Sequence, residues 1–370
     1  MGTKRKLERS NQDGETEIST SHPEIPLSIA GDTFRVVTGC YERVLHGYDV
    51  KIVDGKSTVF LPVFIFSAHL GPIKCVAAKG RYLATGGSDE IIKLHDLKKR
   101  KDLGSLISHS GAITSIYFPF RGHMLSTSED GKMIIWSTKN WDPQEILKGH
   151  KGSVNDVAIH PSGKIALSVG RDRTMRLWNM MTGRKANVQK IEYEGLCVKW
   201  NREGDKFALM SIGKVAVYNM VCPRFSAWVN LQEILKVLEI DTNTRLHAME
   251  YYNHINHGEV ILVACEDRSV KMYNSKNGKL LLEFSGHSSR VKTFGIVRVL
   301  EVDFLVTATS SGDITIWDIN AQKLLGKHET LARLTCLSII DPVVEQVESI
   351  LLSANRQGFR EQGGREAKKR

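Results

Sequence analysis

The stretch HPSGKIALSVGRDRTMRLWNMMTGR, residues 160–184, contains the pattern that decides the fold. Within it, Asp172 lies six residues before Trp178 and four residues after Ser168, and His150 lies a short distance upstream. A serine, a histidine and an aspartate are the residue types of a catalytic triad. The same types can also fasten a repeated β-sheet. Recurrence along the chain separates the two interpretations, because an active site is not repeated in successive segments.

The pattern recurs throughout the chain. Each occurrence follows a turn rich in Gly, Asp, Ser or Arg and is a short run with alternating apolar residues. The matches are YERVLHGYD (41–49), SDEIIKLHD (88–96), EDGKMIIWS (129–137), RDRTMRLWN (171–179), IGKVAVYNM (212–220), EDRSVKMYN (266–274) and SGDITIWDI (311–319). Their aromatic or histidine positions are Tyr48, His95, Trp136, Trp178, Tyr218, Tyr273 and Trp317, spaced by 40 to 55 residues.

This spacing matches the WD repeat, whose unit of about 40–45 residues builds one four-stranded propeller blade. A dipeptide ending in histidine precedes four of the units, at Ala68-His69, Ser108-His109, Gly149-His150 and Gly286-His287. Another strand, such as AITSIYF (112–118), lies between the histidine and the turn. The sequence therefore predicts an all-β protein, a seven-bladed WD-repeat β-propeller.

The recurrence favours a structural role for the residues of the opening stretch. His150, Ser168, Asp172 and Trp178 match the buried hydrogen-bond tetrad that fastens a WD blade. Buried polar side chains need partners, because an unpaired one costs several kcal/mol. The predicted structural tetrads comprise His69, Thr85, Asp89, His109, Ser126, Asp130, Trp136, His150, Ser168, Asp172, Trp178, His287, Thr307 and Trp317.

Three units depart from the pattern. The aspartate position is Ser311 in the seventh unit, so its tetrad is expected to be incomplete. The fifth unit has Ile212 at this position and no histidine, so packing must hold that blade together. The sixth has Asp267 but carries Val263 where a serine or threonine is expected.

The first unit lacks an upstream strand of its own, and the last apolar strand, LTCLSII (334–340), lacks a downstream partner. Pairing the two closes the ring and removes the exposed sheet edges. The predicted organisation is a disordered segment at 1–33, the propeller at 34–353 and a flexible basic tail at 354–370. The long gap at 221–243 is expected to hold an extended loop and a strand, with Phe225 and Trp228 either packed on a blade or free for a partner.

Composition limits the function classes. The 370 residues include 41% hydrophobic and 25% charged residues, as in soluble globular proteins. No apolar run approaches the roughly 18 residues of a membrane helix, and MGTKRKLERS lacks the apolar core of a secretory signal. The six scattered cysteines are expected to be reduced and buried. KRKLER (4–9) has the composition of a nuclear-import signal.

No catalytic set, cofactor or metal site is predicted. The chain has no phosphate-binding glycine loop and no nucleophile elbow. His254-x-x-His257 followed by Glu259 has a spacing similar to that of metal ligands, but no second ligand pair follows, so we expect a hairpin loop there. The protein is therefore not expected to be an enzyme or to bind a small-molecule substrate or a membrane.

The net charge of +10 points to acidic partners. Residues 1–33 carry four basic and six acidic groups, and residues 354–370 carry six and two, which leaves +8 on residues 34–353. A basic body favours nucleic acid through counterion release. A surface that is basic only for solubility remains the alternative.

Several stretches together resemble the family of p21-activated-kinase-interacting proteins, whose fungal members are named for maintenance of the killer phenotype. These are GCYERVLHGYDV, SHSGAITSIYF, the blade containing residues 160–184, HSSRVKTF and ARLTCL, and the resemblance covers about residues 34–340. It implies a nucleolar assembly factor for the large (60S) ribosomal subunit, and some members are described as negative regulators of p21-activated kinases. The long Lys-rich tail of animal members is reduced here to REAKKR.

Three function classes follow. The first is a non-enzymatic scaffold in pre-60S particles, in the nucleus and nucleolus, with assembly factors, ribosomal proteins and rRNA as partners. The second is a signalling adaptor that binds and restrains a p21-activated kinase. The third, a propeller enzyme, lacks a catalytic set. Partner binding is expected on the face where the histidine loops and aspartate turns emerge, through Tyr41, Lys151, Arg171 and Arg290.

Overall fold

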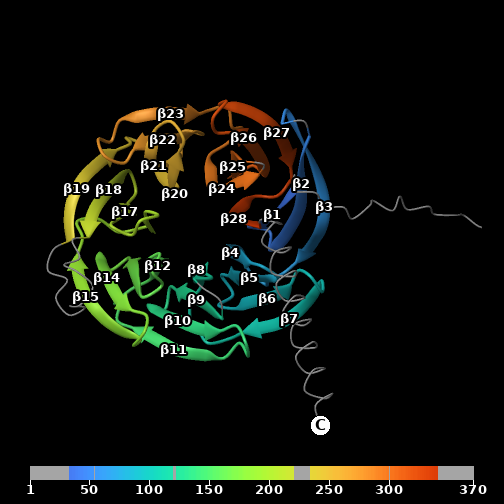
Figure 1. The fold of residues 1–370 in the computed structure, drawn as a ribbon. Coiled ribbons are helices and arrows are strands. Elements are labelled where there is room, and N and C mark those ends of the chain that lie inside the picture. Colours follow the sequence, from blue (N-terminus) through green and yellow to red (C-terminus); the bar gives the residue numbers. More distant parts are fainter. Residues whose placement is uncertain (1–32, 54, 120–121, 221–233, 300, 341–370) are drawn as a thin grey trace, which may run out of the picture.

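The structure is a ring of seven four-stranded antiparallel sheets around a central channel (Figure 1). It is a computed structural model that describes residues 33–53, 55–119, 122–220, 234–299 and 301–340. All secondary structure in this part of the chain is strand, which confirms the prediction of an all-β, seven-bladed propeller.

The blades are numbered in chain order, and their strands are given from the channel outwards. Blade 1 contains β28 (Leu334–Ile340), β1 (Thr33–Cys40), β2 (Val44–Val53) and β3 (Ser57–Ser67). Blade 2 contains β4 (Ile73–Lys79), β5 (Tyr82–Gly87), β6 (Ile92–Asp96) and β7 (Lys101–Leu106). Blade 3 contains β8 (Ile113–Tyr117), β9 (His123–Ser128), β10 (Lys132–Ser137) and β11 (Pro143–Lys148).

The remaining four blades follow the same order. Blade 4 contains β12 (Val154–Ile159), β13 (Ile165–Gly170), β14 (Thr174–Asn179) and β15 (Arg184–Lys190). Blade 5 contains β16 (Cys197–Trp200), β17 (Lys206–Met210), β18 (Lys214–Met220) and β19 (Ile234–Asp241). Blade 6 contains β20 (Leu246–His254), β21 (Gly258–Cys265), β22 (Val270–Asn274) and β23 (Leu280–Phe284). Blade 7 contains β24 (Val291–Val299), β25 (Val302–Thr309), β26 (Asp313–Asp318) and β27 (Lys323–Glu329).

Blade 1 is assembled from both ends of the ring, as predicted. β28 pairs antiparallel with β1 from Arg35–Ile340 to Cys40–Leu334. The Thr335 hydroxyl lies 3.0 Å from the Gly39 carbonyl oxygen and 2.6 Å from that of Ile73, so β28 is joined to blade 2 as well. The C-terminal strand therefore closes the ring.

The hydrophobic core lies between blades. Each cluster of buried apolar side chains combines residues from two neighbouring sheets. Leu167 and Leu177 of blade 4, for example, pack with Val198 and Phe207 of blade 5. Since a sheet that is apolar on both faces needs cover on both, every blade depends on two neighbours.

The seven aromatic or histidine positions of the sequence repeat occupy one structural position. In every blade, the pairing of the third strand with the outer strand shifts register immediately before this residue, as at Leu94/His95 in blade 2 and Leu177/Trp178 in blade 4. The same shift occurs in the other five blades. This β-bulge makes residues comparable from blade to blade.

Some predicted segments lie wholly or partly outside the described residues. The strand expected within 221–243 is β19. Phe225, Trp228, KRKLER, residues 341–353 and the basic tail are not described. None of the described segments is a helix long and apolar enough to cross a membrane.

We predict that removing residues 334–370 unfolds the whole ring, because it exposes the inner edge of β1 and uncovers apolar faces of blades 7 and 2. Circular dichroism during heating should show loss of the cooperative transition. A chain that ends at residue 340 is the control and should retain that transition. Cooperative unfolding of the shorter variant near the parent temperature would contradict the prediction.

Candidate functional site

Blade 4 contains a continuous chain of hydrogen bonds through four side chains. Trp178 Nε1–H donates to Ser168 Oγ over 2.8 Å, and Ser168 Oγ lies 2.7 Å from His150 Nε2. His150 Nδ1 lies 3.0 Å from Asp172 Oδ1. With the proton on Nδ1, the imidazole donates to the carboxylate and accepts from the serine hydroxyl, so every member is satisfied.

The protonation states of this chain suit a structural role. Burial lowers the pKa of His150, which keeps the ring neutral. Burial raises the pKa of Asp172, but hydrogen bonds from the Lys151 N–H, the Thr174 hydroxyl and His150 outweigh it and hold the value at about 2. Ser168 is fully buried, so a substrate has no access to its hydroxyl.

Blade 3 contains the same four-residue chain of hydrogen bonds, and blade 2 contains it without the tryptophan. In blade 3, Trp136 donates to Ser126 over 2.8 Å and His109 Nδ1 lies 3.1 Å from Asp130. In blade 2 the bonds His69–Thr85 (2.8 Å) and His69–Asp89 (3.0 Å) are present, but His95 stands in the tryptophan position. Thr85 therefore lacks an indole donor.

Blade 7 has a different hydrogen-bond arrangement from blades 2, 3 and 4. His287 Nε2 lies 3.1 Å from Thr307 Oγ1, as expected, but Nδ1–H donates to the Arg268 carbonyl oxygen. The sequence predicts that Trp317 and Thr307 belong to one tetrad, but the indole does not bond to Thr307 directly. Its Nε1–H donates to Thr315 Oγ1 over 2.9 Å, and Thr315 in turn lies 2.5 Å from Thr307. Thr315 stands opposite Thr307, where blades 3 and 4 have Ile134 and Arg176, and its hydroxyl links the indole to Thr307.

The four expected partner-binding residues divide into two groups. We call one face of the ring the tetrad face. It is the face with the loops that lead from the outer strand of one blade to the inner strand of the next, and with the turns between the second and third strands of each blade. Lys151 and Arg171 are exposed there on blade 4. Tyr41 and Arg290 lie on blades 1 and 7, on the other side of the ring. The structure thus brings them to one face but not to one site.

An arginine occupies the same position in three successive blades. Arg245, Arg290 and Arg333 each immediately precede the inner strand, β20, β24 or β28. Their carbonyl oxygens accept the backbone N–H groups of Glu266 (2.8 Å), Ser310 (3.1 Å) and Tyr41 (2.8 Å). In blades 2, 3 and 4 the equivalent hydrogen bond ends on an uncharged residue: Pro72, Ala112 or Ser153.

Lys292 completes this arginine cluster of Arg245, Arg290, Lys292 and Arg333. Burial and then the charges of Arg290 and Arg245 lower the pKa of its ammonium group, because its surroundings already hold positive charge. Glu266 offsets part of that charge and pairs with Arg290 over 3.0 Å. The Arg333 guanidinium lies 5.3 Å from the centre of the half-exposed Tyr41 ring.

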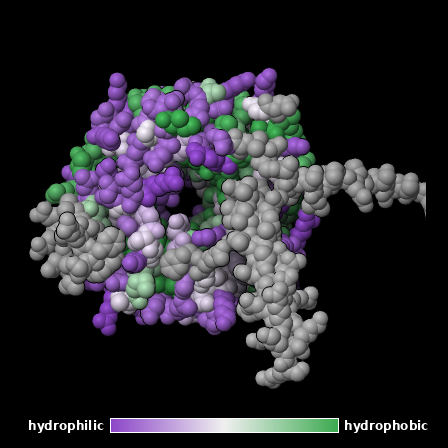
Figure 2. Space-filling model, viewed as in Figure 1, coloured by the Kyte–Doolittle hydropathy of each residue, from purple (hydrophilic) through white to green (hydrophobic). Residues whose placement is uncertain are grey.

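Sequence reasoning missed three members of this cluster. Arg245, Lys292 and Arg333 were not singled out because neither a motif nor the local charge distinguishes them. A signal was present, since aligning the repeats at the start of the inner strand places an arginine in three successive units. Figure 2 shows mainly hydrophilic residues around the channel on the face in view, with smaller hydrophobic areas towards the rim.

The histidine pair at the β20–β21 hairpin forms no shared site with Glu259. The ring centres of His254 and His257 are 4.8 Å apart. The Glu259 carboxylate instead accepts hydrogen bonds from Asn201 and Ser275. Within the described ranges, no group of three or more His, Cys, Asp or Glu residues is placed to hold a metal ion. The five described cysteines are free thiols.

Comparisons with known proteins agree with this architecture. A family model for the WD domain, G-beta repeat matches residues 60–96, 100–137 and 141–179. The p21-activated protein kinase-interacting protein 1-like of Danio rerio is 34% identical over 85% of this chain and 83% of its own length. Protein MAK11 of Saccharomyces cerevisiae is 32% identical over 88% and 87%. The chain belongs to the family of the p21-activated kinase-interacting proteins and MAK11. The human p21-activated protein kinase-interacting protein 1 is another member, 31% identical over 85% of this chain and 79% of its own length.

Each matched repeat begins on or just before the outer strand of one blade and ends in the third strand of the next. Residues 60–96, for example, run from β3 of blade 1 to β6 of blade 2. Consecutive repeats therefore interlock, and the ring is a scaffold in which no blade is a separate sequence unit.

We predict that Ser168→Ala lowers the free energy of unfolding by about 1–3 kcal/mol, because it leaves Trp178 Nε1 without an acceptor and His150 Nε2 without a donor. Thr85→Val is the matched control, since it breaks only the bond to His69, and it should cost less. Urea unfolding measures both. Equal losses would contradict the proposed role of the indole bond.

We predict that acidification weakens the fold. Folding lowers the pKa of four histidines, His69, His109, His150 and His287. Below about pH 6.5 the unfolded chain therefore binds more protons than the folded protein, and the free energy of unfolding decreases. Asp172 adds stability above its ordinary pKa that is lost as the pH falls towards 2. The unfolding temperature should fall between pH 7.5 and 4.5, and less steeply in His150→Gln. A flat profile for the parent protein would refute this.

Proposed function

We propose that the protein is a non-enzymatic scaffold in nucleolar maturation of the large ribosomal subunit. In this role it joins pre-60S assembly factors and ribosomal proteins to rRNA. The resemblance to the maintenance-of-killer family implies this role, and the basic body of residues 34–353 supports a partner rich in phosphate. Localisation in the nucleus and nucleolus belongs to the same proposal.

The arginine cluster is the observation that carries the proposal. Three guanidinium groups at equivalent positions of blades 6, 7 and 1 lie around Lys292 at one side of the channel. Guanidinium groups suit phosphate because they present a planar fork of donors. Blades 2, 3 and 4 have an uncharged residue at this position, so these three guanidinium groups are concentrated in one sector of the tetrad face. We infer that this sector contacts rRNA.

Lys151 and Arg171 form a second candidate contact on blade 4. The Lys151 backbone N–H holds Asp172, so the tetrad fixes its main chain while its side chain is exposed. These two residues suit an acidic segment of an assembly factor. The separation of the two groups allows rRNA and a protein to bind the same face together.

The alternative function is a signalling adaptor that binds a p21-activated protein kinase. It is supported by the printed names of relatives, including Shk1 kinase-binding protein 15 of Schizosaccharomyces pombe, which is 28% identical over 77% of this chain. A kinase-bound protein would sediment without large-subunit precursor RNA, which separates the two functions.

We predict that Arg245→Glu, Arg290→Glu and Arg333→Glu together release the tagged protein from pre-60S particles. Sucrose-gradient sedimentation with probing of retained precursor rRNA measures this. The reversal removes about three phosphate contacts, so the purified variant's RNA affinity should also depend less on salt.

Lys151→Glu with Arg171→Glu is the comparison variant. It should leave RNA affinity nearly unchanged and weaken only protein contacts. Thermal unfolding confirms that both variants are folded. Undiminished particle binding by the folded triple variant would refute the rRNA contact, and recovery of a kinase in place of precursor rRNA would favour the adaptor.

A further inference from the structure

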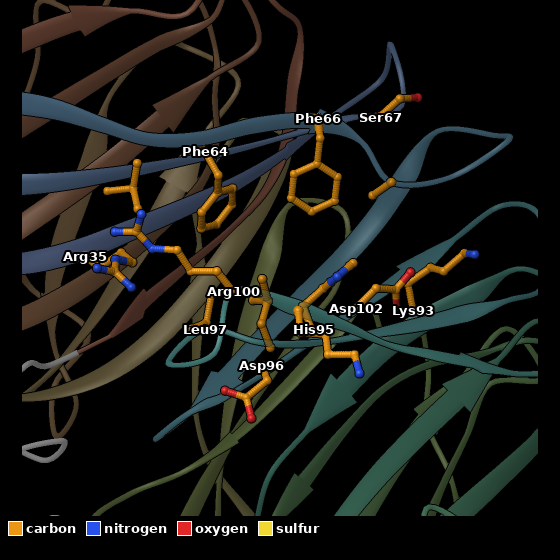
Figure 3. Close-up of a pocket in the computed structure, with 14 residues that line it drawn as sticks. Arg35, Phe64, Phe66, Ser67, Lys93, His95, Asp96, Leu97, Arg100 and Asp102 are labelled. Carbon is orange, nitrogen blue, oxygen red and sulfur yellow. The ribbon is translucent and has the colours of Figure 1, made fainter.

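A hollow of about 390 Å³ opens between the outer parts of blades 1 and 2 (Figure 3). Its walls come from β3 on one side and from β6, β7 and their connecting turn on the other. Phe64 and Phe66 point into it from β3, towards His95 and Leu97 of blade 2. This hollow is at the side of the ring, next to the tryptophan position of the blade 2 tetrad and away from the arginine cluster on blades 6, 7 and 1.

The hollow is associated with a specific replacement. His95 occupies the bulge position that holds Trp136 in blade 3, Trp178 in blade 4 and Trp317 in blade 7. An imidazole is much smaller than an indole, so less of the space beside Thr85 is filled. His95 Nε2 is buried, and within the described residues it has no hydrogen-bond partner.

The walls of the hollow are largely apolar. The Phe66 ring lies edge-on to His95 with the centres 5.1 Å apart, and Leu83 and Ala68 add aliphatic surface. Outside the hollow, β3 also exposes Ile65, and Phe66 itself is 37% exposed. Such a surface on an outer strand suits a large apolar side chain from a partner.

The rim of the hollow is basic. Four consecutive basic residues, Lys98–Lys99–Arg100–Lys101, form the turn between β6 and β7 and the start of β7, and all four are exposed. Arg100 and Lys101 line the hollow, together with Lys93. Asp96 is buried beneath them and accepts the backbone N–H groups of Lys98 and Lys99. Asp102 also lines the hollow and is exposed, so the excess of positive charge comes from Lys93, Arg100 and Lys101 together with the rest of the turn.

We propose that this hollow binds an extended acidic segment of a partner protein, anchored by one tryptophan side chain. The indole ring fills the space that an internal tryptophan fills in blades 3 and 4. Its ring packs against the His95, Phe64 and Phe66 rings, and carboxylates on either side meet the basic turn. Burial lowers the pKa of His95, so the indole meets a neutral imidazole.

A peptide fits the site better than single-stranded RNA. A nucleobase carries several polar edge groups, and most would be buried against Phe64, Leu83 and Ala68 without partners. An indole carries a single N–H group and is otherwise apolar, so it buries far less unpaired polar surface there. The inference does not rest on the proposed ribosomal function, because scaffolds and kinase adaptors alike require partner segments.

The test uses the full chain and a fluorescein-labelled ten-residue peptide of Asp and Glu with one central Trp. Fluorescence polarisation should show saturable binding that weakens at least tenfold in His95→Trp. This variant recreates the blade 3 and 4 arrangement with Thr85 as acceptor, so its unfolding temperature should equal or exceed that of the parent. Arg100→Glu with Lys101→Glu should also weaken binding and reduce its salt dependence.

Matched controls separate the two contributions. Lys185→Glu with Lys190→Glu reverses two exposed charges on β15 of blade 4 and should leave binding unchanged. Peptides with Ser for Trp, or with Asn and Gln for the acidic residues, should lose most of the affinity. A uridine decamer serves as the RNA probe and should not compete with the peptide.

Three results would overturn the proposal. They are equal peptide binding by the parent and His95→Trp, absence of peptide binding at millimolar concentration, and binding of the uridine decamer that His95→Trp abolishes. His95→Trp should leave sedimentation with precursor rRNA unchanged if the arginine cluster alone holds the particle. The outcome here is therefore distinguishable from the outcome for the proposed function.

Discussion

Each sheet of this protein is apolar on both faces, and only a neighbouring sheet can cover it. The core is consequently divided into seven clusters, each between two blades, and none lies within a single blade. A linear stack would leave two faces uncovered, whereas a ring leaves none. The hydrogen-bond chains in blades 2, 3 and 4 act within this frame. They fix the strands of a blade relative to one another, while the apolar contacts fix the blades.

Much of the fold could be predicted from the sequence because the residues that recur in the repeat are those that hold the strands of each blade together. In blades 2, 3, 4 and 7 the bulge residue follows the buried hydroxyl by ten residues, and the histidine precedes that hydroxyl by 16 to 20 residues. The pairing of β28 with β1 follows from ring closure. Blade 7 was less predictable. Trp317 and Thr307 have the expected spacing, but Thr315 lies between them in space and takes the indole N–H. Spacing alone gives no information about which of two nearby hydroxyl oxygens accepts the hydrogen bond from the indole.

The candidate site could be predicted from the sequence less completely than the fold. Tyr41 and Arg290 were expected from the sequence to bind a partner, yet their neighbours Arg245, Lys292 and Arg333 come from three different repeats. Such a cluster exists only because inner strands of successive blades are adjacent around the channel. Divergence among repeats carries the functional information here, both in the arginines of blades 6, 7 and 1 and in His95 of blade 2. Features that all blades share explain stability instead.

The division of blade 1 between the two ends of the ring affects how the protein is made. Gly39 and Thr335 are in contact although 296 residues separate them. At usual synthesis rates of about 5–20 residues per second, roughly 15–60 seconds pass between their appearances. During that interval β1 has a free edge and its sheet lacks an inner strand. Such a free edge offers unpaired backbone groups to other chains, and β28, the last of the described strands to be synthesised, removes it by pairing with β1.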